Sequence, residues 1–175
     1  GDIGRHSSVA RAAKGARVMI GDIADGKAVV DEIVKLHGAK AAASALFDVA
    51  DEASVKAFPA KTMETFGQID VLINNAGGIF ARREFTADGI ERTFATNHLG
   101  PFLLTNLLLD RVSAGTGGRI VNVASESYPS KLDFGNLQGE KSYGFLNAYF
   151  RSKLENIIFS LDLARRLQPS GVTVN

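Results

Sequence analysis

Short apolar runs alternate along the chain with longer segments in which apolar residues recur every three or four positions. Short runs of this kind are typical of buried strands, and the longer periodic segments are typical of amphipathic helices. The pattern predicts strands at residues 16–21, 43–47, 70–73, 119–123 and 172–174. It predicts helices at about 6–14, 25–37, 52–66 and 89–109, and a last helix that contains 147–167. Strands that alternate with helices indicate the α/β class, with a doubly wound parallel sheet and helices on both faces.

Polar residues follow the predicted strands at the points where the strands end. They are Asp22, Asp48, Asn74, Asn75 and Ser125. In parallel α/β sheets, ligands bind outside the carboxyl ends of the strands, so these positions are the first candidates for a site. Each residue taken singly is explained equally well as a helix cap or a turn residue. Their shared position at one edge of the sheet favours a ligand site.

The composition is that of an ordinary globular chain. At 175 residues, with 45% hydrophobic and 22% charged residues, the chain is long enough for one domain, which we predict to span residues 1–175. The net charge of +1 gives no field that would recruit nucleic acid or an anionic membrane. No apolar run reaches the roughly 20 residues that a membrane-spanning helix needs. Localisation is left open, with the cytoplasm as the default and an N-terminal anchor or targeting segment as the alternative.

The residue types present limit the chemistry of any site. The chain has no cysteine, which excludes disulfides, thiolate nucleophiles and zinc–thiolate sites. Its three histidines, His6, His37 and His98, are scattered in sequence and show no metal-ligand spacing. We therefore expect no metal site.

Tyr149 and Lys153 form the pair with the clearest chemical use. They are four residues apart on the last predicted helix, so they share one face, one turn apart. A free phenol titrates at roughly pH 10, and a nearby ammonium favours the phenolate, which suits a phenol to acid/base chemistry at an alcohol or carbonyl. Taken alone, the pair is more simply explained as a surface lysine beside a half-buried tyrosine. Neither of the other two tyrosines has a lysine at this offset.

Four motifs, in order along nearly the whole chain, resemble those of one family. The run Asn74-Asn75-Ala76-Gly77 and the spacing Tyr149-x-x-x-Lys153 are similar to motifs of the short-chain dehydrogenase/reductase family. Segments 97–106 and 136–141 are similar to its retinol-dehydrogenase-like branch, which also has a longer segment between its serine and its tyrosine. Here Ser125 and Tyr149 are 24 residues apart. The resemblance implies a single NAD(P)-binding domain of the Rossmann type.

The resemblance places a catalytic tetrad on Asn97, Ser125, Tyr149 and Lys153. Tyr149 would exchange a proton with the substrate oxygen, and Ser125 would hydrogen-bond that oxygen. Lys153 would favour the phenolate and hold the nicotinamide ribose, while Asn97 would kink its helix and hold a water that relays protons from Lys153. Simpler alternatives stay open. Asn97 would then satisfy a helix carbonyl, and Ser125 would be a cap or turn residue, with Ser127 a weaker candidate for its role.

One acidic residue bears on the choice of cofactor. Asp22 lies 18 residues after Gly4, at a strand end where a carboxylate accepts hydrogen bonds from the adenosine ribose and repels a 2′-phosphate. Relatives that use NADP commonly carry an arginine at the next position, which here is Ile23. We therefore predict NAD in preference to NADP. The resemblance implies these further cofactor-binding residues: Gly4, Asp48, Val49, Asn74, Asn75, Ala76, Gly77, Tyr149 and Lys153.

The chain departs from the family pattern at both ends. Only Gly1-Asp2-Ile3-Gly4 remains of the family's glycine-rich phosphate loop, and Asp2 brings a negative charge where a glycine is expected. A Gly-x-x-Gly register would suit the extended, epimerase-like branch, against which the Asn-Asn-Ala-Gly run argues. The family's first strand and the segment after Asn175 are absent. We expect the two strands beside the missing one to pair directly or to leave backbone groups unpaired.

The sequence predicts an oxidoreductase that transfers a hydride between NAD(P) and an alcohol or carbonyl substrate, with Tyr149 as the general acid/base. The branch resemblance implies an apolar substrate such as a retinoid, a steroid or a lipid aldehyde. The alternatives are a non-catalytic nucleotide-binding member of the family and a truncated product without turnover. Family members commonly associate through the helix that carries the tyrosine and the long helix before the serine strand, so the resemblance makes a homo-oligomer a further expectation. Either that interface or the core contains the apolar residues Ile157, Phe159 and Leu163.

Overall fold

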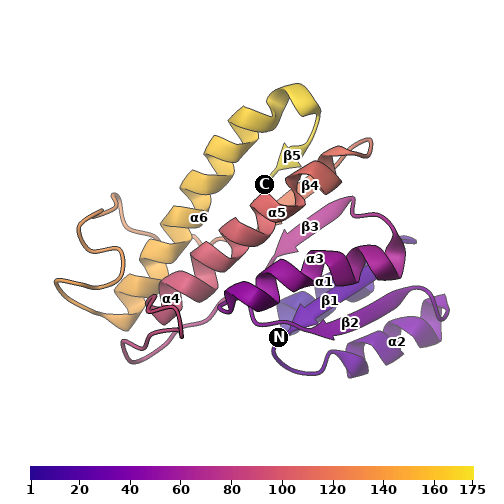
Figure 1. The fold of residues 1–175 in the computed structure, drawn as a ribbon, viewed down its shortest axis with the longest axis horizontal. Coiled ribbons are helices and arrows are strands. Elements are labelled where there is room, and N and C mark those ends of the chain that lie inside the picture. Colours follow the sequence, from indigo (N-terminus) through magenta and orange to yellow (C-terminus); the bar gives the residue numbers. More distant parts are fainter.

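The computed structural model describes every residue from Gly1 to Asn175. Its strands are β1 (Val18–Asp22), β2 (Ala42–Leu46), β3 (Val71–Asn74), β4 (Arg119–Asn122) and β5 (Thr173–Val174). Its α-helices are α1 (Asp2–Ala12), α2 (Lys27–His37), α3 (Glu52–Phe66), α4 (Arg92–Phe94), α5 (Gly100–Ser113) and α6 (Phe145–Leu167). A π-helical turn, η1 (Ala95–Leu99), joins α4 to α5, and a 3₁₀ turn, η2 (Gln168–Ser170), follows α6. The predicted alternation of strands and helices is confirmed (Figure 1).

All strand pairs are parallel, as the sequence predicts. β1 pairs with β2, and Asp22 lies opposite Leu46 at the end of that pair. β3, β4 and β5 form a second sheet in that order, with Asn74 opposite Asn122. β1 and β3 make no strand pairing with one another. Of the two outcomes expected for these strands, the chain therefore adopts the one without direct pairing.

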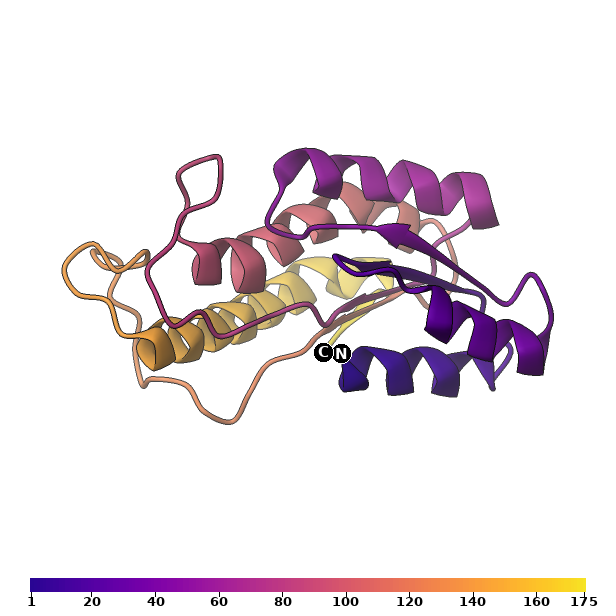
Figure 2. The same cartoon turned by 90° about the horizontal axis from the view of Figure 1, so that it is seen from below.

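Helices cover the strands from both sides. α1 and α2 pack on one side of β1 and β2, and α3 lies on the other (Figure 2). α5 packs against β3 and α3, while α6 packs against β4, β5 and the π-turn η1. This arrangement brings the start of α6 and the π-turn together at the carboxyl ends of β3 and β4.

The main core lies between the second sheet and the helices α3, α5 and α6. It consists of Phe47, Val49, Val55, Leu72, Leu104, Leu108, Val112, Ile120, Leu163 and Val172. Phe159 packs against it. Leu163 therefore belongs to the core, and Phe159 is partly buried at its edge. A smaller core of Ala12, Ile33, Ala41 and Ala42 lies between α1, α2 and the first sheet.

Helix α3 has its predicted bounds because both of its ends are encoded locally. The Asp51 side chain accepts a hydrogen bond from the Ser54 amide at 2.6 Å, which caps the first turn. Gly67 ends the helix in the left-handed conformation, with φ of 74°, and donates to the Met63 carbonyl. The Asp51 cap and Gly67 explain why the bounds predicted from the sequence pattern agree with those of the structure.

Two helices begin three or four residues from their predicted starts. The helix predicted from residue 89 begins at Arg92, because Gly89 has a left-handed φ of 75° and the Glu91 carboxylate caps the amides of Thr93 and Phe94. Helix α1 begins at Asp2 rather than at residue 6, so Gly4 lies inside its first turns instead of in a loop. A glycine inside a helix lowers the stability of the helix by only about 1 kcal/mol relative to alanine. Helix α1 therefore forms with Gly4 in its first turns. None of the helices combines the length and the apolar composition that a bilayer crossing requires.

Candidate active site

Tyr149 and Lys153 lie on the first half of α6, where they border a cavity of about 280 Å³. The cavity is lined by Gly1, Asp2, Ile3, Asn75, Gly77, Val123, Ala124, Tyr149 and Lys153. Its walls therefore come from the start of α1, the segments after β3 and β4, and α6. Four residues that the sequence singled out, Asn75, Gly77, Tyr149 and Lys153, meet in this one place.

Lys153 is almost fully buried at this cavity, with 5% of its surface exposed. Its Nζ atom donates a hydrogen bond to the Val123 carbonyl at 2.9 Å and lies 5.4 Å from the centre of the Tyr149 ring. Burial lowers the pKa of the Lys153 ammonium below its ordinary value. The lysine charge is thus held at the end of β4, beside the tyrosine.

Asn97 lies in the π-turn η1 and is completely buried. Its side-chain Oδ1 accepts from the Gly78 amide at 2.8 Å, and its Nδ2 donates to the Gly78 carbonyl at 3.0 Å. The same Nδ2 donates to Ser152 Oγ at 3.0 Å, and Ser152 in turn donates to the Tyr149 carbonyl. Asn97 therefore joins the segment after β3 to the helix that carries Tyr149 and Lys153.

Gly77 lies closely against two of these side chains. A Cβ atom added at Gly77 would lie 3.4 Å from Asn97 Oδ1 and 3.7 Å from Lys153 Nζ. A side chain here would fill the space next to the lysine. The glycine keeps the floor of the cavity open and allows close approach of another group to the backbone.

Polar side chains behind the cavity tie the two strand ends to the helices. Asn74 Nδ2 donates to Thr105 Oγ1 and to Asn122 Oδ1, both at 2.8 Å. Asn122 Nδ2 donates to Ser160 Oγ at 2.8 Å. The sequence indicated Asn74 but not its partners, because these lie on other elements and carry no motif of their own.

Ser125 follows β4 and is half-buried. Its Oγ accepts a hydrogen bond from the Ser127 amide at 3.1 Å, so the residue does form the turn that the simpler interpretation required. This contact leaves the hydroxyl proton free to donate to another acceptor. Ser125 does not line the Tyr149 cavity, although the preceding residue, Ala124, does.

Gly4 and Asp22 lie at the far side of the cavity from α6. A Cβ atom added at Gly4 would lie 3.3 Å from Asn75 Nδ2, so helix α1 approaches the Asn75 segment closely. Asp22 is partly exposed at the end of β1, where Oδ1 accepts from the Ala24 amide at 3.0 Å. Its Oδ2 lies 3.9 Å from the Gly1 ammonium.

Three other predicted cofactor residues lie outside the lining of this cavity. Asp48 is exposed, and its Oδ1 accepts from the Ala50 amide at 2.8 Å. Val49 is buried in the main core, where it contacts Gly100 closely. Ala76 is exposed between Asn75 and Gly77.

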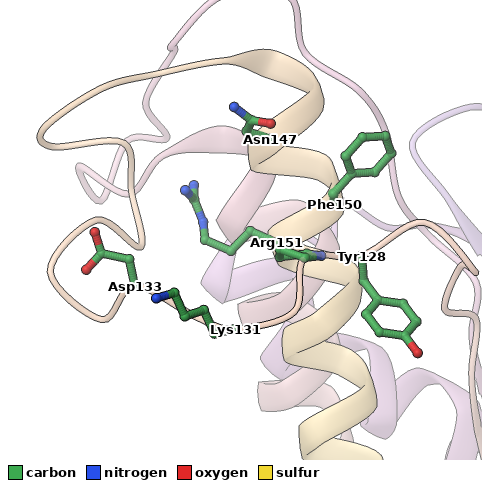
Figure 3. Close-up of a pocket in the computed structure, with 7 residues that line it drawn as sticks. Tyr128, Lys131, Asp133, Asn147, Phe150 and Arg151 are labelled. Atoms are coloured by element: carbon green, nitrogen blue, oxygen red, sulfur yellow. The ribbon is translucent and has the colours of Figure 1, made fainter.

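A second cavity, of about 360 Å³, borders the first turns of α6. It is lined by Tyr128, Pro129, Lys131, Asp133, Asn147, Phe150 and Arg151. Figure 3 shows Lys131, Asp133 and the Arg151 side chain on one side of α6, and Tyr128 and Phe150 on the other. The Phe150 ring contacts the ring of Tyr149, which lines the first cavity, at a centroid distance of 5.9 Å. No group of three or more His, Asp or Glu side chains is placed to hold a metal ion.

Comparison with known proteins identifies the family. The family model of the short chain dehydrogenases matches residues 1–175. Human retinol dehydrogenase 11 is 41% identical over 174 residues, and human retinol dehydrogenase 12 is 40% identical over 175 residues. Each alignment covers 98% of this chain and 55% of the relative, so the chain spans about half the length of these relatives. The chain belongs to the short-chain dehydrogenase family.

Solved structures agree on the fold. An uncharacterised protein from Mycobacterium paratuberculosis is similar with a TM-score of 0.80 at 33% identity, covering 98% of this chain and 61% of that protein. A short chain dehydrogenase from Burkholderia cenocepacia, solved in complex with NADP, has a TM-score of 0.74 at 30% identity. That comparison covers 98% of this chain and 67% of the other. The Rossmann-like α/β fold predicted from the sequence is confirmed.

Proposed function

We propose that this chain carries the active site of an NAD(P)-dependent oxidoreductase that transfers a hydride between its cofactor and an alcohol or carbonyl substrate. The observation that carries the proposal is the shared cavity. Tyr149 and Lys153, which offer a phenol and an ammonium, line it together with Asn75 and Gly77. Membership of the short-chain dehydrogenase family supports the same reaction class.

The residues at the cavity fit a nicotinamide cofactor. Gly77 leaves space beside Lys153 Nζ for a ring or a ribose, and Lys153 is the donor that would hold ribose hydroxyls. The first residues of α1 also line the cavity, and free amides at a helix N-terminus favour a phosphate group. When bound there, the cofactor would supply or accept the hydride. Asp2 is the one lining residue whose charge opposes a phosphate.

The chemistry assigned to the chain's own residues is proton transfer and orientation. In the reduction direction Tyr149 donates its phenolic proton to the substrate oxygen as that oxygen gains charge. Lys153 holds its charge beside the ring and stabilises the phenolate that remains. Ser125 has a free hydroxyl proton with which it orients the substrate oxygen. Asn97 fixes the Gly78 backbone and the Ser152 hydroxyl, which sets the position of α6 relative to the cavity floor.

We propose NAD as the preferred cofactor. Asp22 lies at the end of β1 with its side chain partly exposed, in the position from which a carboxylate accepts from ribose hydroxyls and repels a 2′-phosphate. The following residue is Ile23, which offers no positive charge to a phosphate. The solved relative from Burkholderia cenocepacia binds NADP, so the two cofactors need a direct comparison in this chain.

For the substrate, we propose an apolar alcohol or aldehyde. The support is the similarity to the retinol dehydrogenases. A panel of retinal, a steroid ketone and a medium-chain lipid aldehyde, each assayed by NADH oxidation, tests this proposal. Reduction of small polar carbonyls alone would contradict it.

The experiment that tests the reaction itself is the replacement Tyr149→Phe, which removes only the phenolic oxygen. General acid/base catalysis contributes roughly 100-fold to 10,000-fold, so turnover should fall at least about 100-fold while NADH binding stays within about twofold. Tyr128→Phe is the matched control and should leave both unchanged. Unchanged turnover in Tyr149→Phe would refute the assignment. Binding of NADH without turnover in the unmodified chain would favour the non-catalytic alternative.

We also propose that the chain self-associates through the outward faces of α5 and α6. Large apolar side chains are exposed there, namely Phe102, Leu107, Ile158 and Leu161. Leu161 is 68% exposed, and together with the other three side chains it offers the apolar surface that an interface between two copies would bury. Light scattering after size exclusion tests the proposal. Leu161→Lys should shift a dimer to a monomer, and a monomeric unmodified chain would contradict it.

A further inference from the structure

The π-turn η1 leaves one main-chain carbonyl directed at helix α6. The Asn97 carbonyl accepts a hydrogen bond from Asn156 Nδ2 at 2.8 Å, and both groups are buried. A π-turn displaces carbonyls from the regular helical ladder, so such a group needs a partner from outside the helix. Asn156 supplies it. Asn97 is therefore held at two points on α6, by its side chain at Ser152 and by its carbonyl at Asn156.

Asn156 is itself oriented by His98, the residue that follows Asn97. His98 Nδ1 lies 2.9 Å from Asn156 Oδ1. Because the Asn156 amide nitrogen already donates to the Asn97 carbonyl, its Oδ1 must be the acceptor. This requires His98 to carry its proton on Nδ1. The histidine thus fixes the direction of the asparagine amide, and the amide fixes the π-turn.

The surroundings of His98 keep the ring neutral and in place. It lies among the rings of Phe94, Phe102 and Phe159, at centroid distances of 5.7, 6.1 and 6.3 Å. Burial lowers the pKa of His98 below its ordinary value. A neutral ring with one fixed donor is what the contact to Asn156 needs.

We propose that His98 and Asn156 are positioning residues for the active site. They hold the π-turn so that the Asn97 side chain reaches both Gly78 and Ser152. These two contacts set the distance between the cavity floor at Gly77 and the helix that carries Tyr149 and Lys153. We call the linked contacts of His98, Asn156 and Asn97 the clamp. The geometry of the clamp does not depend on the proposed oxidoreductase function, whereas its consequence for turnover rests on that function.

The first test uses the unmodified 175-residue chain and needs neither cofactor nor turnover. Long-range ¹⁵N–¹H NMR correlations of the imidazole report which nitrogen carries the proton. The expected result is a neutral ring with the proton on Nδ1. A neutral ring with the proton on Nε2 would overturn the proposal, because Asn156 could not then be oriented as described.

The second test removes one donor without removing volume. Asn156→Leu has nearly the same size but leaves the Asn97 carbonyl without its partner. The Gly78 amide is bound by Asn97, so its hydrogen exchange should become at least about tenfold faster, while exchange in α3 stays unchanged. Unchanged exchange at Gly78 in a folded Asn156→Leu chain would refute the clamp.

The third test separates positioning from stability. His98→Leu keeps the apolar contacts but lacks the donor, whereas His98→Asn restores a donor near the Nδ1 position. The expected outcome is a kcat at least about tenfold lower in His98→Leu with KM within about twofold, and recovery to within about threefold in His98→Asn. Equal kcat in both variants would count against the proposal. If the unmodified chain shows no turnover while the NMR results hold, the proposed reaction fails and the clamp stands.

Discussion

The Lys153 ammonium lies 5.4 Å from the centre of the Tyr149 ring and donates at 2.9 Å to the main-chain carbonyl of Val123, at the end of a different element. Both residues lie on α6, and the ammonium at the end of the lysine side chain is in addition anchored to the segment after β4. This anchor fixes where the charge lies relative to the phenol. This contact gives the first prediction.

Lys153→Met keeps the length of the side chain but removes its charge and its hydrogen bond to Val123. We expect turnover to fall at least about 100-fold and NADH binding to weaken several-fold, because the phenolate loses its charge partner and the ribose loses a donor. Steady-state kinetics and a fluorescence titration measure the two effects. Lys131→Met, at an exposed lysine, is the control. Full activity in Lys153→Met would show that the lysine is only a structural residue.

Asp22→Ser removes the carboxylate at the end of β1 and keeps an oxygen that can bind the Ala24 amide. Loss of the charge that repels a 2′-phosphate should improve the affinity for NADPH relative to NADH by roughly tenfold, which corresponds to about 1.4 kcal/mol. Titrations with both cofactors give the ratio. Asp25→Ser, three residues further along in the loop after β1, should leave it unchanged. A chain that already binds NADPH as well as NADH would contradict the role given to Asp22.

Asp2→Asn tests the unfavourable charge at the start of α1. Asp2 lines the Tyr149 cavity, and its carboxylate would lie near the phosphates of a bound cofactor. Neutralising it should tighten NADH binding by about threefold to tenfold, more at low ionic strength than at high. Weaker binding in Asp2→Asn at every salt concentration would place the phosphates elsewhere.

Glu155 predicts a pH dependence of stability. Both of its carboxylate oxygens are buried without a hydrogen bond, and its charge partner, Arg151 Nε, lies 3.9 Å away. Burial raises the pKa of Glu155 from 4.5 to about 7, despite the opposing effect of Arg151, and the nearby Glu91 raises it further. Because the pKa is raised in the folded chain, the unfolded chain loses this proton first as the pH increases.

The contribution of Glu155 to the free energy of unfolding should therefore be largest below about pH 4.5 and should fall between that pH and about pH 7. The loss is on the order of 3 kcal/mol for a shift of this size. Urea denaturation at several pH values measures it. Glu155→Gln should flatten this part of the profile and stabilise the chain at pH 8, whereas Glu126→Gln, at an exposed position, should not. A profile unaffected by Glu155→Gln would contradict the burial of an ionisable carboxyl.

The sequence was sufficient for the fold class and for four residues that the fold brings together at one cavity. Strand-like and helix-like periodicities gave the order of elements, and α3 has its predicted bounds because Asp51 and Gly67 encode its ends. Tyr149 and Lys153 were recognised because a helix places residues four apart on one face. Asn75 and Gly77 were indicated by their position after a strand, where parallel sheets bind ligands.

The residues that hold the site in place from behind, such as His98 and Asn156, could not be predicted from the sequence in the same way. The spacing of the histidines gives no sign of the role of His98, because its partner Asn156 is far away in sequence and only the fold brings them together. One signal was available in the sequence. Ser152, Asn156 and Ser160 recur every four residues on α6, which marks a stripe of small polar side chains along one face of the helix. Such a stripe requires polar partners from the elements that pack against it.

The most direct test of the proposed cofactor site is a fluorescence titration of the 175-residue chain with NADH, repeated with Tyr149→Phe and Lys153→Met. We expect saturable binding with a Kd below about 100 μM, retained in Tyr149→Phe and weakened in Lys153→Met. Absence of binding would show that the cavity at Tyr149 is not the cofactor site. Binding that stays the same in Lys153→Met and in variants of Asn75 and Gly77 would show the same.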